Sequence, residues 1–128
     1  MGRRRLLLID DSATARALLR ILLMNEPFDL FEESDPRSAL ERLSREAFDV
    51  VIADFTMPHL TGIELVQIIR ASPKPELSWL PIILLTAESE AELEGQAMRA
   101  GANCFLRKPV KPETLRTALK QVVPALAR

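Results

Sequence analysis

The stretch Leu6-Leu7-Leu8-Ile9-Asp10-Asp11 is a short apolar run that ends in two carboxylates. Three more apolar runs lead into residues that carry a charge or form hydrogen bonds: Val50–Ala53 into Asp54, Ile82–Leu85 into Thr86, and Ala102–Leu106 into Lys108-Pro109. Short apolar runs of this kind are typical of buried strands in a parallel sheet. The carboxyl ends of parallel strands meet at one edge, so we expect these polar residues to converge.

The segments between the runs are amphipathic, which predicts helices that link the strands. The expected helices are Ser12 to Met24, one that starts at Asp35-Pro36 and buries Ala39, Leu40 and Leu43, Thr61 to Ala71, Ser89 to Gly101, and one with an apolar stripe from Leu115 to Leu126. Phe28–Glu33 is expected to form a further strand. The helix before Gly101 has few large apolar residues, so we expect it to shift most easily.

Other segments give less specific expectations. Ser72–Leu80 contains two prolines and the single tryptophan, so it is expected to be a loop in which Trp79 packs against the fold. Arg3–Arg5 is expected to be a solvated lead-in to the first strand. Cys104 lies inside an expected strand and is expected to be a buried thiol in a reducing compartment.

Length and composition favour one domain over residues 1–128, because a chain of 128 residues with 48% hydrophobic residues can bury its own core. The net charge of −1 gives no support for direct nucleic-acid binding. No apolar run approaches the length of a membrane span. We therefore expect a soluble, cytoplasmic protein.

The convergent residues predict a metal and phosphate site. Asp10, Asp11 and Asp54 would repel one another if packed together, and a cation between them relieves that repulsion. Carboxylate oxygens suit magnesium, so Mg²⁺ is the expected cofactor. A lysine beside a bound Mg²⁺, here Lys108, then suits a phosphoryl group.

Together these motifs resemble the receiver domains of two-component response regulators. The resemblance covers nearly the whole chain and rests on an acidic pair after the first strand, Asp-x-x-Met-Pro-x-x-x-Gly from Asp54 to Gly62, Thr86-Ala87 after the fourth run, and Phe105 followed by Lys108-Pro109. Each motif alone is weak, but all of them in order are a strong signal. The resemblance implies a flavodoxin-like, doubly wound α/β fold with five parallel strands in the order 2-1-3-4-5 and five helices. It also implies that the peptide before Pro109 is often cis.

The resemblance assigns a role to each site residue. Asp54 would take a phosphoryl group from a phosphohistidine as an acyl phosphate. Asp11 would bind Mg²⁺ directly and Asp10 through water, with Asp54 and the backbone carbonyl of Thr56 as further ligands. The remaining phosphoryl oxygens would be bound by Lys108, the Thr86 hydroxyl and the Ala87 amide.

The same resemblance implies a switch. Thr86 would move towards the phosphoryl group, and Phe105 would turn inward without needing a hydrogen bond. Thr56 and Glu88 occupy positions that tune the lifetime of the acyl phosphate. The readout face would be the helix before Gly101, the fifth strand and the last helix, and it could also form a homodimer.

The expected partners are a histidine kinase or phosphotransfer protein, and a downstream protein or an output domain. A stand-alone regulator and a receiver from a larger protein fit equally well. The domain would not be an enzyme in the ordinary sense, although it would promote its own phosphorylation and dephosphorylation.

Two alternative functions remain open at this point. A receiver-like binding module would never carry a phosphoryl group, but such modules usually lack the acceptor or an acidic partner, and neither is lost here. A haloacid-dehalogenase-like phosphohydrolase would need a second acid two residues after Asp54, where this chain has Thr56. A flavin-binding flavodoxin is disfavoured, because the acids after the first strand would repel a phosphate.

Overall fold

The computed structural model describes residues 3–88 and 91–123, and at its centre is a five-stranded parallel sheet. The strands are β1 (Arg4–Ile9), β2 (Phe28–Glu33), β3 (Val50–Asp54), β4 (Ile82–Thr86) and β5 (Cys104–Arg107). Their order is β2-β1-β3-β4-β5, which confirms the expected flavodoxin-like topology. Asp54 pairs with Leu85 and Thr86 with Arg107, so the carboxyl ends of neighbouring strands lie side by side.

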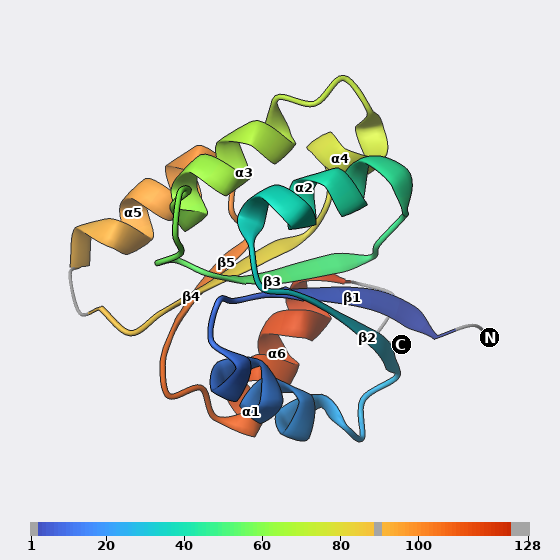
Figure 1. Ribbon diagram of the computed structural model, residues 1–128. Helices are drawn as coiled ribbons and strands as arrows, with labels where there is room; N and C mark the ends of the chain where they lie inside the picture. The colour runs from blue at the N-terminus through green and yellow to red at the C-terminus, as the bar shows by residue number, and fades with distance from the viewer. Residues whose placement is uncertain (1–2, 89–90, 124–128) are drawn as a thin grey trace.

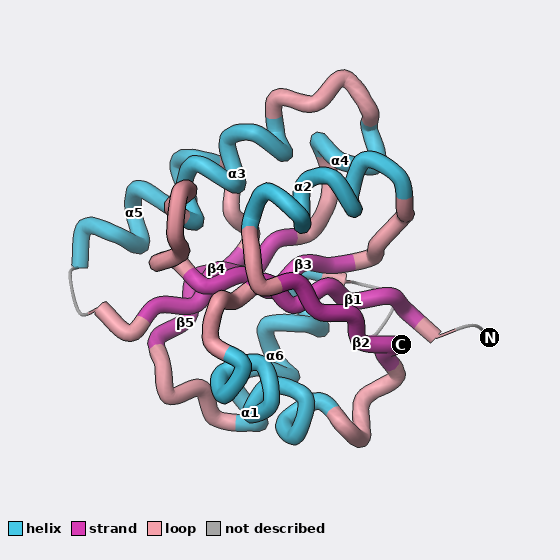
Figure 2. Tube along the Cα trace, viewed as in Figure 1, coloured by secondary structure: helices cyan, strands magenta, loops and turns pink. Residues whose placement is uncertain are grey.

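Helices cover both faces of the sheet (Figures 1 and 2). One face carries α1 (Ala13–Leu23) and α6 (Pro112–Val122), and the other carries α2 (Pro36–Arg45), α3 (Gly62–Arg70) and α5 (Ala91–Ala100). Successive strand residues point to opposite faces, so each strand contributes to both apolar clusters. In β1, for example, Leu6 and Leu8 pack with α1 and α6, while Leu7 and Ile9 pack with α2, α3 and α5.

The starts of the first three long helices follow the expected capping residues. The Ser12 hydroxyl accepts a hydrogen bond from the Ala15 amide, and Asp35 caps the helix that begins at Pro36. Thr61 and Glu64 form the complete capping box predicted by their spacing. These caps fix where the chain turns away from each strand end. Of the other expected helix limits, Ser89 and Leu126 lie outside the described residues.

The described residues contain six helices, one more than expected, because part of the predicted loop forms the short helix α4 (Pro75–Ser78). Pro75 occupies the first turn, where its fixed φ suits a helix and its missing amide costs nothing. Leu77 packs against the core, and the Arg70 guanidinium donates to the carbonyl oxygens of Leu77 and Ser78. Tertiary contacts therefore hold a helix that is too short to show a periodic pattern.

Three side-chain expectations were wrong. Arg4 and Arg5 belong to β1, and the Arg5 guanidinium carbon lies 4.6 Å from the ring centroids of both Phe31 and Phe48, so the Arg5 side chain is only partly solvated. Trp79, the C-cap residue of α4, is 82% exposed and does not pack against the core. Cys104 is only partly buried, and this burial raises the pKa of its thiol.

Helix α5 buries two of its residues. Leu93 and Ala97 are buried, whereas Met98 is exposed. Helix α1 also buries only two residues, so the expectation that α5 shifts most easily stays a prediction. Within the part of the chain that the structure describes, no helix is both long enough and apolar enough to cross a membrane.

Candidate phosphoacceptor and metal site

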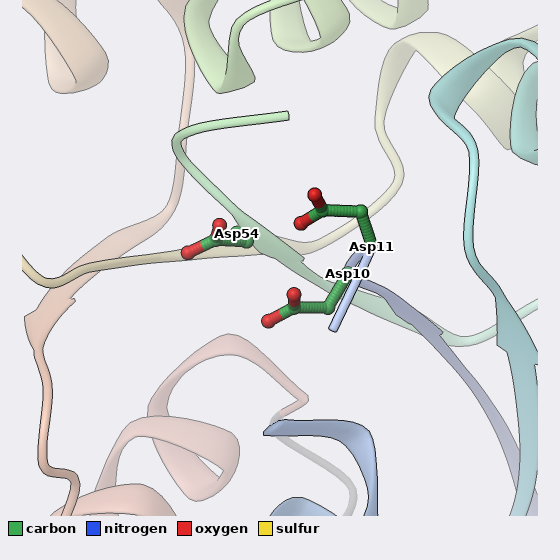
Figure 3. A group of neighbouring side chains, drawn as sticks. All are labelled: Asp10, Asp11 and Asp54. Atoms are coloured by element: carbon green, nitrogen blue, oxygen red, sulfur yellow. The ribbon is translucent and has the colours of Figure 1, made fainter. Parts of the chain in front are cut away.

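Three carboxylates meet at the carboxyl edge of the sheet (Figure 3). Asp10 and Asp11 follow β1, and Asp54 is the last residue of the adjacent strand β3. One oxygen from each carboxylate lies within 4.8 Å of the others. Asp10 is buried, the Asp54 side chain is 12% exposed, and Asp11 is open to solvent. The strand-end residues therefore converge as predicted, in a cup that is open on one side.

Lys108 neutralises part of this charge. Its Nζ atom lies 3.1 Å from Oδ2 of Asp10 and 3.0 Å from Oδ1 of Asp54. Burial lowers the pKa of Lys108, but hydrogen bonds to Asp54 and Asp10 outweigh it, so the pKa is raised and the ammonium is retained. The Lys108–Pro109 peptide is cis, as the resemblance implies.

The positive charge of Lys108 does not balance the negative charges of the three carboxylates. Burial raises the pKa of Asp54, the hydrogen bond and charge of Lys108 lower it in part, and the charges of Asp10 and Asp11 raise it again, so the pKa is raised overall. A further cation between the carboxylates would remove this penalty. Three carboxylates in an open cup are a donor set that fits Mg²⁺, which keeps several of its water ligands.

Asp10 and Asp11 differ in the hydrogen bonds that their oxygens already accept. The Ser12 amide donates to Oδ1 of Asp10 at 2.9 Å, and Lys108 donates to Oδ2. The Asp10 carbonyl accepts from Nη1 of Arg16 at 2.5 Å. These bonds hold Asp10 from both its side chain and its backbone. Asp11 is the exposed carboxylate of the pair and has the freer approach to a metal ion.

Thr86 and Ala87 lie at the β4 end of the sheet. Thr86 is 1% exposed, and its hydroxyl accepts a hydrogen bond from the Glu88 amide at 3.0 Å. Ala87 is exposed. The Thr56 hydroxyl, two residues beyond Asp54, donates to Oε1 of Glu88 at 3.3 Å. The two residues expected to tune the acyl phosphate lifetime therefore contact each other.

Phe105 lies in the inward position that the resemblance implies for one state of the switch. It is 8% exposed, and its ring meets that of Phe55 edge to face with centroids 6.5 Å apart. Phe105 belongs to the same apolar cluster as Leu93 and Ala97 of α5. A movement of this ring would therefore change the packing of α5.

Two arginines near the site were not anticipated from the sequence. Arg16 binds both the Asp10 carbonyl and Glu32 of β2, and Arg107 donates to the Glu88 carbonyl at 3.0 Å. The sequence offers only weak signals for these contacts: Arg16 lies on the first expected helix, and Arg107 lies next to Lys108. Neither reveals which backbone carbonyl a guanidinium will reach.

Comparisons with known proteins agree on one family. The family model described as response regulator receiver domain matches residues 6–120. The chain is 35% identical to chemotaxis protein CheY-3 of Vibrio cholerae serotype O1 over 123 residues, which cover 95% of this chain and 93% of the relative.

Two solved structures are also similar. The chemotaxis response regulator CheY4 of Vibrio cholerae superposes with a TM-score of 0.84 at 32% identity, covering 94% of this chain and 99% of that one. The signal receiver domain of a signal transduction histidine kinase from Syntrophus aciditrophicus gives a TM-score of 0.84 at 27% identity, covering 98% and 93%.

Proposed function

The chain belongs to the family of response regulator receiver domains, and we propose that it is a switch that accepts a phosphoryl group on Asp54. The observation that carries the proposal is the position of Lys108, whose ammonium lies between Asp10 and Asp54 inside a cluster of three carboxylates. A structural ion pair needs only one acid. Three acids and one lysine at strand ends instead match a site for a metal ion and a phosphoryl group.

The proposed reaction is an in-line displacement on phosphorus. A carboxylate oxygen of Asp54 attacks the phosphorus of a phosphohistidine, the phosphorus–nitrogen bond breaks, and the imidazole leaves. Asp11, Asp54 and the Thr56 carbonyl would hold Mg²⁺ directly, and Asp10 through water. The metal ion would supply neutralisation of charge on the phosphoryl oxygens.

The protein residues would bind the remaining phosphoryl oxygens. Lys108 would exchange its bonds with Asp10 and Asp54 for one to the phosphoryl group, and the Ala87 amide would donate another. The Thr86 hydroxyl now accepts from Glu88, so its own proton is available to a phosphoryl oxygen. Movement of Thr86 and Phe105 would then displace α5, because Phe105 shares an apolar cluster with Leu93 and Ala97 of that helix.

This movement would change the surface formed by α5, β5 and α6, which we propose as the face that contacts a downstream protein, an output domain or a second copy of the chain. The phosphodonor would be a histidine kinase or phosphotransfer protein. We propose no separate hydrolase activity, because Thr56 cannot replace the acid that a phosphohydrolase uses for turnover.

The proposal is tested by incubating the protein with phosphoramidate and Mg²⁺ and measuring both its intact mass and the phosphate released. A switch gains one phosphoryl mass and releases phosphate slowly. An unchanged mass without phosphate release favours the binding module, whereas rapid continuous release favours a hydrolase.

A further inference from the structure

Glu88 is held from two sides at the carboxyl edge of the sheet. Its carboxylate accepts a hydrogen bond from the Thr56 hydroxyl at 3.3 Å, and its carbonyl accepts one from Nη1 of Arg107 at 3.0 Å. Thr56 follows β3, Glu88 follows β4, and Arg107 ends β5. Two hydrogen bonds therefore tie together the ends of three adjacent strands, and we call Thr56, Glu88 and Arg107 the strand-end bridge.

The bridge lies immediately beyond Asp54. Asp54 pairs with Leu85, and its neighbour Phe55 donates to the Leu85 carbonyl at 2.7 Å. The loops after β3 and β4 therefore leave the sheet side by side, and the bond from Thr56 to Glu88 connects them. Both residues are exposed, whereas the Asp54 side chain is largely covered. The bridge thus joins Thr56 and Glu88, the two residues whose positions the resemblance links to the lifetime of the acyl phosphate.

We propose that Arg107 is a positioning residue that keeps the Glu88 carboxylate on Thr56 and thereby slows the attack of water on phosphorylated Asp54. The proposal rests on the proposed function. In the hydrolysis, a water oxygen bonds to phosphorus and the bond from phosphorus to the Asp54 oxygen breaks. Asp54 returns as a carboxylate, inorganic phosphate is released, and the water proton passes to solvent.

Arg107 acts on Glu88 through the backbone. Glu88 lies at a point where the described chain has no regular structure, so the Arg107 bond holds its backbone and the Thr56 bond holds its side chain in place of a helix or strand. If the Arg107 bond is lost, the Glu88 backbone can move and its carboxylate can leave Thr56, which opens a path for water. Glu88→Ala removes the carboxylate but keeps the backbone carbonyl that Arg107 binds. The effect of Arg107→Ala can therefore be measured with and without the Glu88 carboxylate.

The experiment measures the lifetime of the acyl phosphate. Wild type is phosphorylated with phosphoramidate and Mg²⁺, the donor is removed by gel filtration, and loss of the phosphoryl group is followed by intact mass. Arg107→Ala should shorten the lifetime by about two- to tenfold, the factor that corresponds to the net free energy of one hydrogen bond. Arg107→Lys retains a donor and a charge and should restore most of the lifetime. Lys111→Ala, which removes another exposed cation shortly after Arg107 in the sequence, should leave the lifetime unchanged.

A double-mutant cycle separates a positioning role from a general one. Glu88→Ala should also shorten the lifetime, and Arg107→Ala should have no further effect in that background. An unchanged lifetime in Arg107→Ala, or an equal effect of this substitution with and without the Glu88 side chain, would overturn the inference and leave the proposed function intact. If wild type gains no phosphoryl group at all, both this inference and the proposed function are refuted.

Discussion

Asp54→Asn is expected to stabilise the protein in metal-free buffer, although Asp54 is the proposed phosphoacceptor. The substitution removes one of three neighbouring charges but keeps the shape of the side chain. The amide oxygen of the introduced asparagine can still accept a hydrogen bond from Lys108, and Lys108 keeps Asp10 as its ionic partner. No buried charge is therefore left without a partner.

The magnitude follows from three opposing effects. At an effective dielectric constant of about 20, Asp10 and Asp54, whose nearest oxygens lie within 4.8 Å, repel by at least about 3.5 kcal/mol, and Lys108 and Asp54 at 3.0 Å attract by about 5.5 kcal/mol. Repulsion from the exposed Asp11 is screened by water. The attraction to Lys108 thus exceeds the repulsion by at most about 2 kcal/mol, and the cost of burying the Asp54 carboxylate, several kcal/mol per ion, outweighs it, in agreement with the raised pKa of Asp54. We expect a gain of about 1–2 kcal/mol in the free energy of unfolding, or about 3–8 °C in Tm.

The pH dependence has a defined sign. The pKa of Asp54 is higher in the folded protein, so the folded state binds this proton more tightly than the unfolded chain does. The Asp54 contribution to stability is therefore lost as pH rises from about 4, the unfolded value, through the folded pKa. The advantage of Asp54→Asn should appear above about pH 4 and vanish below it.

The assay is urea and thermal denaturation in EDTA and in Mg²⁺, across pH. A metal ion that binds only the folded state stabilises it by RT ln(1 + [Mg²⁺]/Kd), about 2.7 kcal/mol at 100 times Kd. Mg²⁺ should therefore stabilise wild type more than Asp54→Asn. Asp29→Asn, at an exposed ion pair, should change stability by less than about 0.5 kcal/mol. A lower stability of Asp54→Asn in EDTA, or equal stabilisation of both proteins by Mg²⁺, would refute the reasoning.

Three further predictions concern neighbouring residues. Lys108→Ala should still be phosphorylated, more slowly, but its α5–β5–α6 amide resonances should not shift as in wild type; a wild-type shift would contradict the role of Lys108. Phe105→Ala should lower the free energy of unfolding by about 3 kcal/mol in urea denaturation yet retain Mg²⁺-dependent phosphorylation, because the ring is buried but makes no bond to the phosphoryl group. Cys104 should react with iodoacetamide more slowly in the folded protein than in urea, since its pKa is raised; equal rates would exclude an effect of burial.

The sequence predicts the sheet and its central residues because strand ends carry a strong local signal. Asp10, Asp54 and Lys108 each follow a short apolar run, and parallel topology then brings them together without further information. The strand order itself came from the resemblance and not from the apolar runs. Helix starts such as that at Thr61 were predicted because capping chemistry is local.

The errors involve contacts between elements that are distant in the sequence. The Arg5 side chain lies over Phe31 and Phe48, which belong to the second strand and a later loop, so nothing near Arg5 reveals its environment. Helix α4 depends on Arg70 of the preceding helix and is too short for a periodic pattern. The strand-end bridge likewise depends on loop conformations that spacing does not define.

The phosphorylated residue itself provides the most direct test of the central claim. Borohydride reduces an acyl phosphate to an alcohol, so a phosphorylated aspartate is converted to homoserine, which peptide mass spectrometry can locate. After incubation with phosphoramidate and Mg²⁺, the account predicts homoserine at position 54 alone and none when Mg²⁺ is replaced by EDTA. Reduction at another residue, or none in the presence of donor and Mg²⁺, would contradict it.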